Sequence, residues 1–409
     1  MKSESARQCQ LQDGIYWTAG TRPARQWRLL LMNVRAGATR YEVRAALASV
    51  WTMLEKLRDG IIRDLQPVRD TDPAPSELSV ASADLRCLLG FGARLFSTQD
   101  HVPPVTAPLP QDGGLAQLRA LGRAGTHGPY PSLRWGAATD CSIGEADLAI
   151  QLTAETDFAV SNALVEVWKL VQDEDLPLDF VTFHAGHARE DQRSWLGFHD
   201  CVSNLDPSER RAAIEVGTDD ASWMCGGTYM AFLRLPIDLT AWGSLRREHQ
   251  ELLVGRDKLT GCPLVAVERG PYGELRPIPA NVHALAPEYI DPSRPADPLL
   301  RASHVHRANV NRVGPDHADS NRIFRQGYQF VEPLAGGGVR AGLNFVSFQR
   351  GLSCLTNILE AQIWLGEVNF GGPRVLTAGL ASISLLTVLA GGYYAIPPKR
   401  EPFPGADIF

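Results

Sequence analysis

The chain has 409 residues, of which 44% are hydrophobic, so it can bury one large core or two ordinary ones and is too apolar for a disordered protein. Its formal net charge is -6, from 40 Lys plus Arg against 46 Asp plus Glu, with no long basic run. This balance argues against a nucleic-acid-binding protein, although local patches can still bind small anions.

The cysteines indicate a reducing compartment. There are seven, scattered along the chain without a C-x-x-C pair, so neither a disulfide framework nor a structural zinc site is predicted. Residues 1–14 lack the apolar region of a signal peptide and a twin-arginine motif. We therefore expect a cytoplasmic protein.

The first half of the chain alternates between strand and helix patterns. In order, these patterns predict a strand at 26–34, a helix at 41–57, strands at 84–91 and 147–154, a helix that begins at Thr156 or Asp157, and a strand at 179–186. The Pro- and Gly-rich passage 101–138 is assigned no regular structure. This order is the split βαβ arrangement of a ferredoxin-like domain, which we expect to cover residues 1–190.

The second half repeats the order of elements without a repeat in sequence. It predicts a strand at 226–235, a helix at 238–253, a proline-rich connection at 277–299, a strand at 342–350 and a helix near 353–365. The predicted fold class is therefore α+β, with two ferredoxin-like domains built on antiparallel sheets. The second domain is expected to cover residues 191–409.

The uncharged segment 375–396 is long enough to span a bilayer. It is rich in small residues, however, and contains the helix-breaking pair Gly391-Gly392. We interpret it as a buried helix followed by a strand and expect no membrane partner.

Residues 303–330 concentrate histidine and arginine in an otherwise acidic chain. His304 and His306 would point to the same side of an extended segment, but they would diverge on a helix. One of them could be an axial metal or haem ligand, with Arg325 as a separate chemical group. The alternative is a polar surface loop, in which exposed His and Arg are common.

A second candidate site is the segment 194–204. Asp200 lies between the aromatic Phe198 and small residues, so a partly apolar pocket would raise its pKa toward that of a general acid or base. The alternative is an Asp that caps a turn or the next helix.

Four motifs occur in a fixed order: G-x-x-D at 197–200, H-x-x-R-A-N at 304–309, R-x-G-Y at 325–328 and G-L-x-F at 342–345. Together they resemble the dye-decolourising peroxidase family of haem proteins. The final residues, GGYYAIPPKREPFPGADIF, also look like the closing strand and turn of that family.

The resemblance implies haem b as cofactor, bound mainly by the second domain. His304 would be the axial iron ligand, Arg307 would help to hold a propionate, and Leu343 and Phe345 would line the distal face. Asp200 would shuttle a proton and Arg325 would stabilise charge while hydrogen peroxide is cleaved. The implied activity is oxidation of aromatic or dye-like electron donors through a ferryl intermediate.

Two positions depart from the family pattern. Cys201 stands where relatives have glycine, and His306 stands where arginine is usual. Both leave open a non-peroxidatic haem-binding protein for storage, transfer or sensing, and a third hypothesis is a ferredoxin-like module without haem. Glu360 is a candidate partner for the second nitrogen of His304, with an exposed helix residue as the alternative. A homo-oligomer is left open.

Overall fold

The computed structural model describes residues 10–16, 24–65, 76–96, 133–137, 143–199, 204–205, 207–218, 220–280, 297–308, 322–359 and 385–409. The elements of the first half are β1 (Gln26–Val34), α1 (Arg40–Arg58), β2 (Ile61–Leu65), β3 (Ser76–Ser79), β4 (Arg86–Gly92), β5 (Leu148–Ala154), α2 (Asp157–Asp173) and β6 (Leu178–His187). Helices and strands in this half thus follow the predicted order, with the β2–β3 hairpin added between α1 and β4.

The second half begins with α3 (Pro207–Ile214), β7 (Thr228–Pro236), α4 (Leu239–Ser244), α5 (Arg247–Val254), β8 (Leu264–Arg269) and β9 (Leu275–Pro279). It continues with α6 (Pro298–Arg301), α7 (His304–Ala308), β10 (Phe324–Pro333), β11 (Val339–Gln349), α8 (Ser353–Leu359) and β12 (Ala390–Ile396). The strands predicted at 226–235 and 342–350 are therefore confirmed as β7 and β11.

The main strands close into a barrel in the order β1-β5-β4-β12-β7-β11-β10-β6. Neighbouring strands pair antiparallel, which confirms the predicted sheet type. The four barrel strands of each half can be numbered 1 to 4 in chain order. Both halves then have the order 4-1-3-2 around the barrel, so the second half repeats the topology of the first. Strands of both halves belong to the same barrel. The domain boundary expected near residue 190 therefore stays a prediction.

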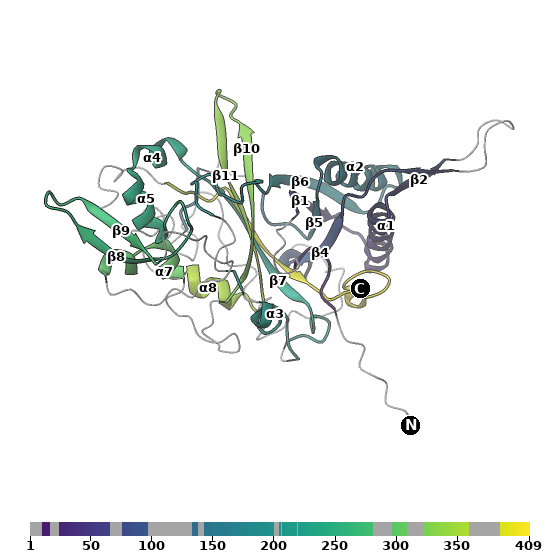
Figure 1. The fold of residues 1–409 in the computed structure, drawn as a ribbon. Coiled ribbons are helices and arrows are strands. Elements are labelled where there is room, and N and C mark those ends of the chain that lie inside the picture. The colour runs from purple at the N-terminus through teal and green to yellow at the C-terminus, as the bar shows by residue number, and fades with distance from the viewer. Residues whose placement is uncertain are drawn as a thin grey trace.

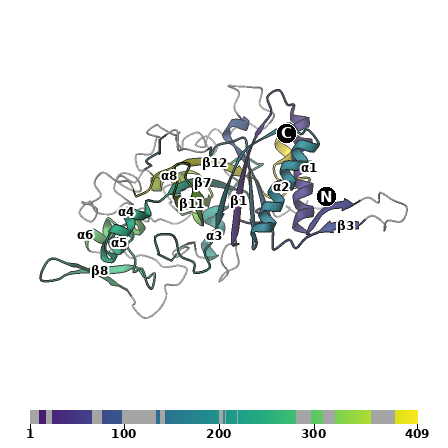
Figure 2. The ribbon, with the colours of Figure 1, turned by 90° about the horizontal axis from the view of Figure 1, so that it is seen from above.

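Helices cover opposite sides of this barrel. Figure 1 shows α1 and α2 on one side and α4, α5, α7 and α8 on the other, and the second view agrees (Figure 2). The β10–β11 hairpin projects beyond the rest of the sheet in Figure 1. The barrel wall therefore has an inner face and, in each half, an outer face that helices cover.

Local sequence signals explain where the first two helices begin. Thr39 and Glu42 form a capping box at the start of α1, and the Thr156 side chain accepts a hydrogen bond from the backbone N–H of Ala159 at the start of α2. Thr156 is thus the cap, and Asp157 is the first helical residue. Both helices bury one apolar face against the sheet.

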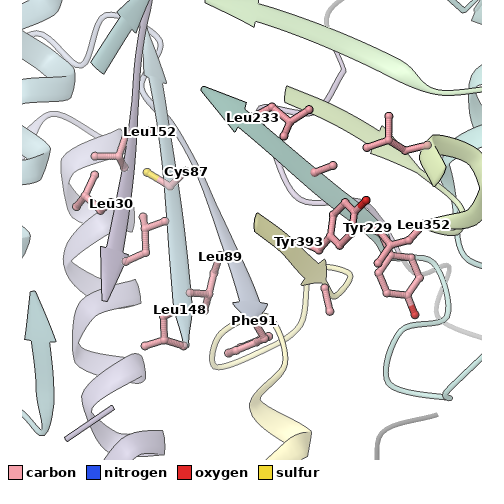
Figure 3. Close-up of a cluster of buried hydrophobic side chains, with 14 of the residues drawn as sticks. Leu30, Cys87, Leu89, Phe91, Leu148, Leu152, Tyr229, Leu233, Leu352 and Tyr393 are labelled. Carbon is pink, nitrogen blue, oxygen red and sulfur yellow. The ribbon is translucent and has the colours of Figure 1, made fainter. Parts of the chain in front are cut away.

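The core has two layers because strand residues alternate between the two faces of the barrel wall. The inner cluster contains Trp27, whose ring stacks on Tyr328 with centroids 5.3 Å apart. The outer cluster joins sheet residues such as Leu152 and Leu233 to the helices that cover them (Figure 3). The inner layer holds the barrel together, whereas the outer layer fixes the helices on it.

The helix predicted at 238–253 is wrong as a single element, because it is broken into α4 and α5. Leu245 and Arg246 are extended, and the Gln250 side chain donates hydrogen bonds to the carbonyl groups of Trp242 and Leu245. These bonds satisfy carbonyls at the end of α4 that a continuous helix would have used. The β8–β9 hairpin was not predicted either.

The remaining predictions are only partly covered by the described residues. The strand at the end of 375–396 is confirmed as β12, whereas 375–384 lies outside the described residues, as do 101–132 and 360–365. Within the described ranges, no helix is long and apolar enough to cross a membrane. Cys87, Cys225, Cys262 and Cys354 form no disulfide within the described ranges.

Substitution of Gly392 by alanine should destabilise the barrel. A Cβ at this position would lie 2.1 Å from the carbonyl oxygen of Gly144, which accepts the 2.6 Å hydrogen bond of the Tyr394 hydroxyl. We expect the free energy of unfolding, measured in urea, to fall by about 1–3 kcal/mol. The control Gly243→Ala, in α4 with nothing within 4 Å, should raise it by about 0.5–1 kcal/mol. Equal effects of the two substitutions would contradict this packing.

His184 should make stability depend on pH. Burial, and then the charge of Arg234, lower its pKa from 6.5 to about 4. Between these values the unfolded chain binds a proton that the folded chain does not, so stability is fully present above pH 6.5 and declines as the pH falls toward 4. In urea unfolding at several pH values, His184→Gln should show a shallower decline than the wild type. Parallel curves would refute this assignment.

Candidate functional site

The outer face of the β10–β11 pair carries the residues that the motifs single out. In the register of the two strands, Arg325 lies opposite Ser347, and Gly327 lies opposite Phe345. Directly paired residues of an antiparallel ladder project to the same face, and residues two apart on one strand do so as well. Arg325, Leu343 and Phe345 therefore share one face, with an open position at Gly327.

The side chains on the opposite face of β10 point into the barrel interior. Phe324 and Tyr328 belong to the inner cluster, and the Gln326 side chain donates hydrogen bonds to the carbonyl groups of Gly14 and Ile15. These contacts fix which face of β10 points inward. Arg325 consequently points away from the barrel interior.

The segment that contains Asp200 is fastened to β10 on both sides of this residue. On one side, Trp195 donates its backbone N–H to Gln329 Oε1 at 3.1 Å and its indole N–H to the carbonyl of Phe330 at 3.2 Å. On the other side, the Asn204 amide is bound to Arg325. Trp195 and Asn204, which flank Asp200 in the sequence, are therefore both attached to β10.

Asn204 acts as a clamp on the backbone of Arg325. Its Nδ2 donates to the carbonyl of Arg325 at 2.8 Å, and its Oδ1 accepts from the N–H of Arg325 at 3.0 Å. Asn204 is 5% exposed, so water competes little for these bonds. The two bonds therefore fix the backbone of Arg325 against the residue that precedes α3.

His304 and His306 lie on α7. Because this segment is helical, the two residues from His304 to His306 correspond to a rotation of roughly 200° about the axis. The side chains consequently diverge, which decides between the two possibilities that the sequence left open. His304 is half-buried and His306 is buried. Burial lowers the pKa of Arg307 on the same helix.

A tight contact joins α7 to the end of α5. Gly255 ends α5 with a φ of 91°, and a Cβ at this position would lie 2.4 Å from Ser303 Oγ. Only glycine combines this backbone conformation with such a close approach. The contact brings the next residue, Arg256, beside the segment that starts α7.

Arg256 is a residue that the sequence did not point to. It is 4% exposed, and its guanidinium donates a 2.8 Å hydrogen bond to the carbonyl of Gly261. Burial, and then the positive charge of Arg325, lower the pKa of Arg256 to about 10. Two guanidinium groups that repel each other in a desolvated region favour a bound anion nearby. In the sequence, Arg256 is one of three consecutive charged residues, a pattern that does not indicate this role.

The structure describes some of the predicted site residues and not others. Arg325, Leu343 and Phe345 are brought to one face, and both Phe345 and Val305 of α7 pack against the same outer cluster. Asp200, Cys201 and Glu360 lie outside the described residues, as does the end of the H-x-x-R-A-N motif. The described residues thus include an imidazole on α7, apolar and cationic side chains on one face of β10 and β11, and the buried Arg256 after α5.

Solved structures share this fold. A DyP-type peroxidase from Cellulomonas bogoriensis has a TM-score of 0.66 at 19% identity, over 97% of this chain and 96% of that chain. An oxyferrous complex of DtpA from Streptomyces lividans gives the same TM-score, identity and coverage. The mixed helix and strand fold with antiparallel sheets is therefore that of DyP-type peroxidases.

Curated relatives match a shorter region. Deferrochelatase from Escherichia coli K12 is 24% identical over 229 residues, which are 52% of this chain and 49% of that protein. Deferrochelatase from Shigella flexneri has the same identity and coverage. The chain therefore spans about half the length of these relatives in the match.

A family model described as the C-terminal part of Dyp-type peroxidases matches residues 191–401. This segment, with 401 − 191 + 1 = 211 residues, is more than half of the 409 in the chain. The chain therefore belongs to the Dyp-type peroxidase family.

Proposed function

We propose that this chain is a haem peroxidase of the dye-decolourising type, which uses hydrogen peroxide to oxidise aromatic or dye-like donors. The observation that carries the proposal is that Trp195 and Asn204, which flank Asp200 in the sequence, are both hydrogen-bonded to β10, the strand that carries Arg325. Membership of the family supports it. So do solved structures of the same fold, which include oxyferrous and ferric DtpA from Streptomyces lividans.

The available side chains fit the parts of a haem. His304 offers an imidazole nitrogen for the iron, and the half-buried Leu343 and Phe345 offer apolar surface for the macrocycle. Arg307 and the buried Arg256 offer guanidinium groups to the propionates. Haem b is the form we propose, bound mainly by the second half of the chain.

The two faces of the site have different tasks. His304 would be the axial ligand, and a carboxylate on its other nitrogen would increase its donor strength. Glu360 is our candidate for that carboxylate. His306 would not share the iron, because the helical geometry of α7 directs its side chain away from that of His304.

When bound, haem supplies the redox-active iron at which peroxide is reduced. Asp200 would accept a proton from one peroxide oxygen and deliver it to the departing oxygen. Arg325 would stabilise the negative charge that develops during this transfer. Leu343 and Phe345 would exclude water, which strengthens the interaction of Arg325 with that charge.

The second candidate function is haem handling without peroxidation, for storage, transfer or sensing. It is favoured by the name deferrochelatase that the curated relatives carry and by the unusual Cys201 and His306. The two functions differ in the response of the haem-loaded protein to hydrogen peroxide. Rapid oxidation of an aromatic donor would favour the first function, and haem that stays bound without donor oxidation would favour the second.

Removal of the proposed axial ligand should abolish haem binding. His304→Ala protein, expressed with a haem precursor, should lose the Soret absorption band because the iron has no protein ligand. His306→Ala is the matched control, since it removes the same side chain two residues away and should keep the band. The assignment is wrong if His306→Ala loses the band and His304→Ala keeps it.

Loosening the Asn204 clamp should slow the reaction with peroxide without removing haem. We expect Arg325→Ala to lower the rate about 10²–10³-fold, because it removes the charge-stabilising group. Asn204→Ala should lower it about 10- to 100-fold, because it removes both hydrogen bonds that hold the backbone of Arg325. Arg340→Ala, which changes a surface residue paired with Glu332, is the control. Stopped-flow absorption after peroxide mixing measures all three, and equal rates would contradict the proposed distal site.

A further inference from the structure

The chain forms a tight turn a few residues after β6. The backbone N–H of Ser194 donates to the carbonyl of Phe198 at 2.9 Å, and the flanking residues Arg193 and His199 form an antiparallel bridge. Gly197 has a φ of 87°, a conformation that favours glycine. The turn therefore closes on itself and ends at His199.

The guanidinium of Arg193 donates four hydrogen bonds across this turn. Nη1 donates to the carbonyl of Gly197 at 2.7 Å and to that of Lys258 at 2.6 Å. Nη2 donates to Nε2 of His199 at 2.9 Å and to the carbonyl of Leu259 at 3.0 Å. A planar guanidinium suits this arrangement because it carries several donors in a fixed geometry. One side chain thus ties the turn to the loop after α5.

Arg193 also fixes the state of the His199 ring. An arginine can only donate, so Nε2 of His199 accepts and its Nδ1 carries the proton. Burial, and then the charge of Arg193, lower the pKa of His199, with Asp191 as the other charged group beside it. His199 is therefore held as a neutral imidazole in one orientation.

The loop after α5 also carries Arg256. Lys258 donates its backbone N–H to Oε1 of the buried Glu251 at 2.9 Å, which fixes the loop on α5. Two residues before Lys258, Arg256 is buried, and it lies close enough to Arg325 for the charge of Arg325 to lower its pKa. The loop therefore joins the turn that precedes Asp200 to the surroundings of Arg325.

The middle of the turn is attached independently of Arg193. The indole N–H of Trp242 donates to the carbonyl of Leu196 at 3.2 Å, and the Phe198 ring packs edge-on against Trp242 with centroids 6.3 Å apart. Trp195 is bonded to β10. Loss of the guanidinium should therefore leave the turn folded and release its last residue.

We propose that Arg193 is a positioning residue for Asp200, through its hydrogen bond to the preceding His199. This inference rests on the proposed peroxidase function, in which Asp200 carries the proton. Because a peptide bond joins His199 to Asp200, a fixed His199 sets the direction in which the chain enters the aspartate. Arg193 carries no proton itself, since its guanidinium stays charged. Arg193 and Asn204 thus hold the two proposed distal groups separately, Arg193 for Asp200 and Asn204 for Arg325.

A double-mutant cycle in the full chain with haem bound tests this role. Stopped-flow absorption gives the rate of the reaction with hydrogen peroxide for the wild type, Arg193→Ala, Asp200→Ala and the double variant. We expect Arg193→Ala to lower the rate about 10- to 100-fold when Asp200 is present. In the chain that already carries Asp200→Ala, it should lower the rate less than about twofold, because the group that it positions is gone. A purely structural role would give the same factor in both backgrounds.

Hydrogen–deuterium exchange gives a second readout that does not depend on activity. In Arg193→Ala, backbone amides of the peptide that ends at His199 should exchange faster than in the wild type, while those of β1 should not change. Arg193→Lys should react with peroxide faster than Arg193→Ala, because its ammonium can still donate to some of the four acceptors.

Arg189→Ala is the matched control, because it removes an arginine of the same segment whose guanidinium pairs with Asp191, and it should keep the rate. A Soret band in every variant verifies folding and haem binding. Equal factors in both backgrounds of the cycle, or an equal loss in Arg189→Ala, overturn the positioning role while the peroxidase function stands. A wild-type protein without haem binding or without a reaction with peroxide overturns both.

Discussion

The candidate site depends on the alternation of side chains along β10. Phe324, Gln326 and Tyr328 fill the barrel interior, so Arg325 and Gly327 must face outward. A slip of one residue in the pairing with β11 would exchange the two sets, which would bury a guanidinium among aromatic rings and expose those rings. The energetic cost of that exchange fixes the register. The chemistry proposed for Arg325 is therefore a consequence of how the barrel packs.

Segments far apart in the sequence are joined to this strand by specific contacts. The N-terminal segment reaches Gln326 through backbone carbonyls, and Asn204 holds Arg325 through both groups of its amide. The close approach of Gly255 to Ser303 ties the end of α5 to the start of α7. Each contact uses a small or polar residue where a larger or apolar one would separate the segments. The site is thus assembled by local geometry at a few positions.

Much of the fold could be predicted because it depends on periodic burial and on caps. The strands 26–34 and 179–186 alternate or run apolar, and Thr156 caps its helix in the structure as in the sequence. The break between α4 and α5 could not be predicted, since it depends on a side chain that bonds back from the next helix. The clamp at Asn204 and the buried Arg256 are likewise contacts between distant segments. Patterns within one segment carry no information about them.

We propose that a haem lies between α7 and the outer face of β10, with its iron bound by His304. The most direct measurement is a crystal structure of the haem-loaded protein with anomalous data at the iron absorption edge. We expect a single iron peak at bonding distance from the His304 imidazole, with Arg325 on the opposite side of the haem. An iron peak beside His306, or elsewhere in the molecule, would contradict it.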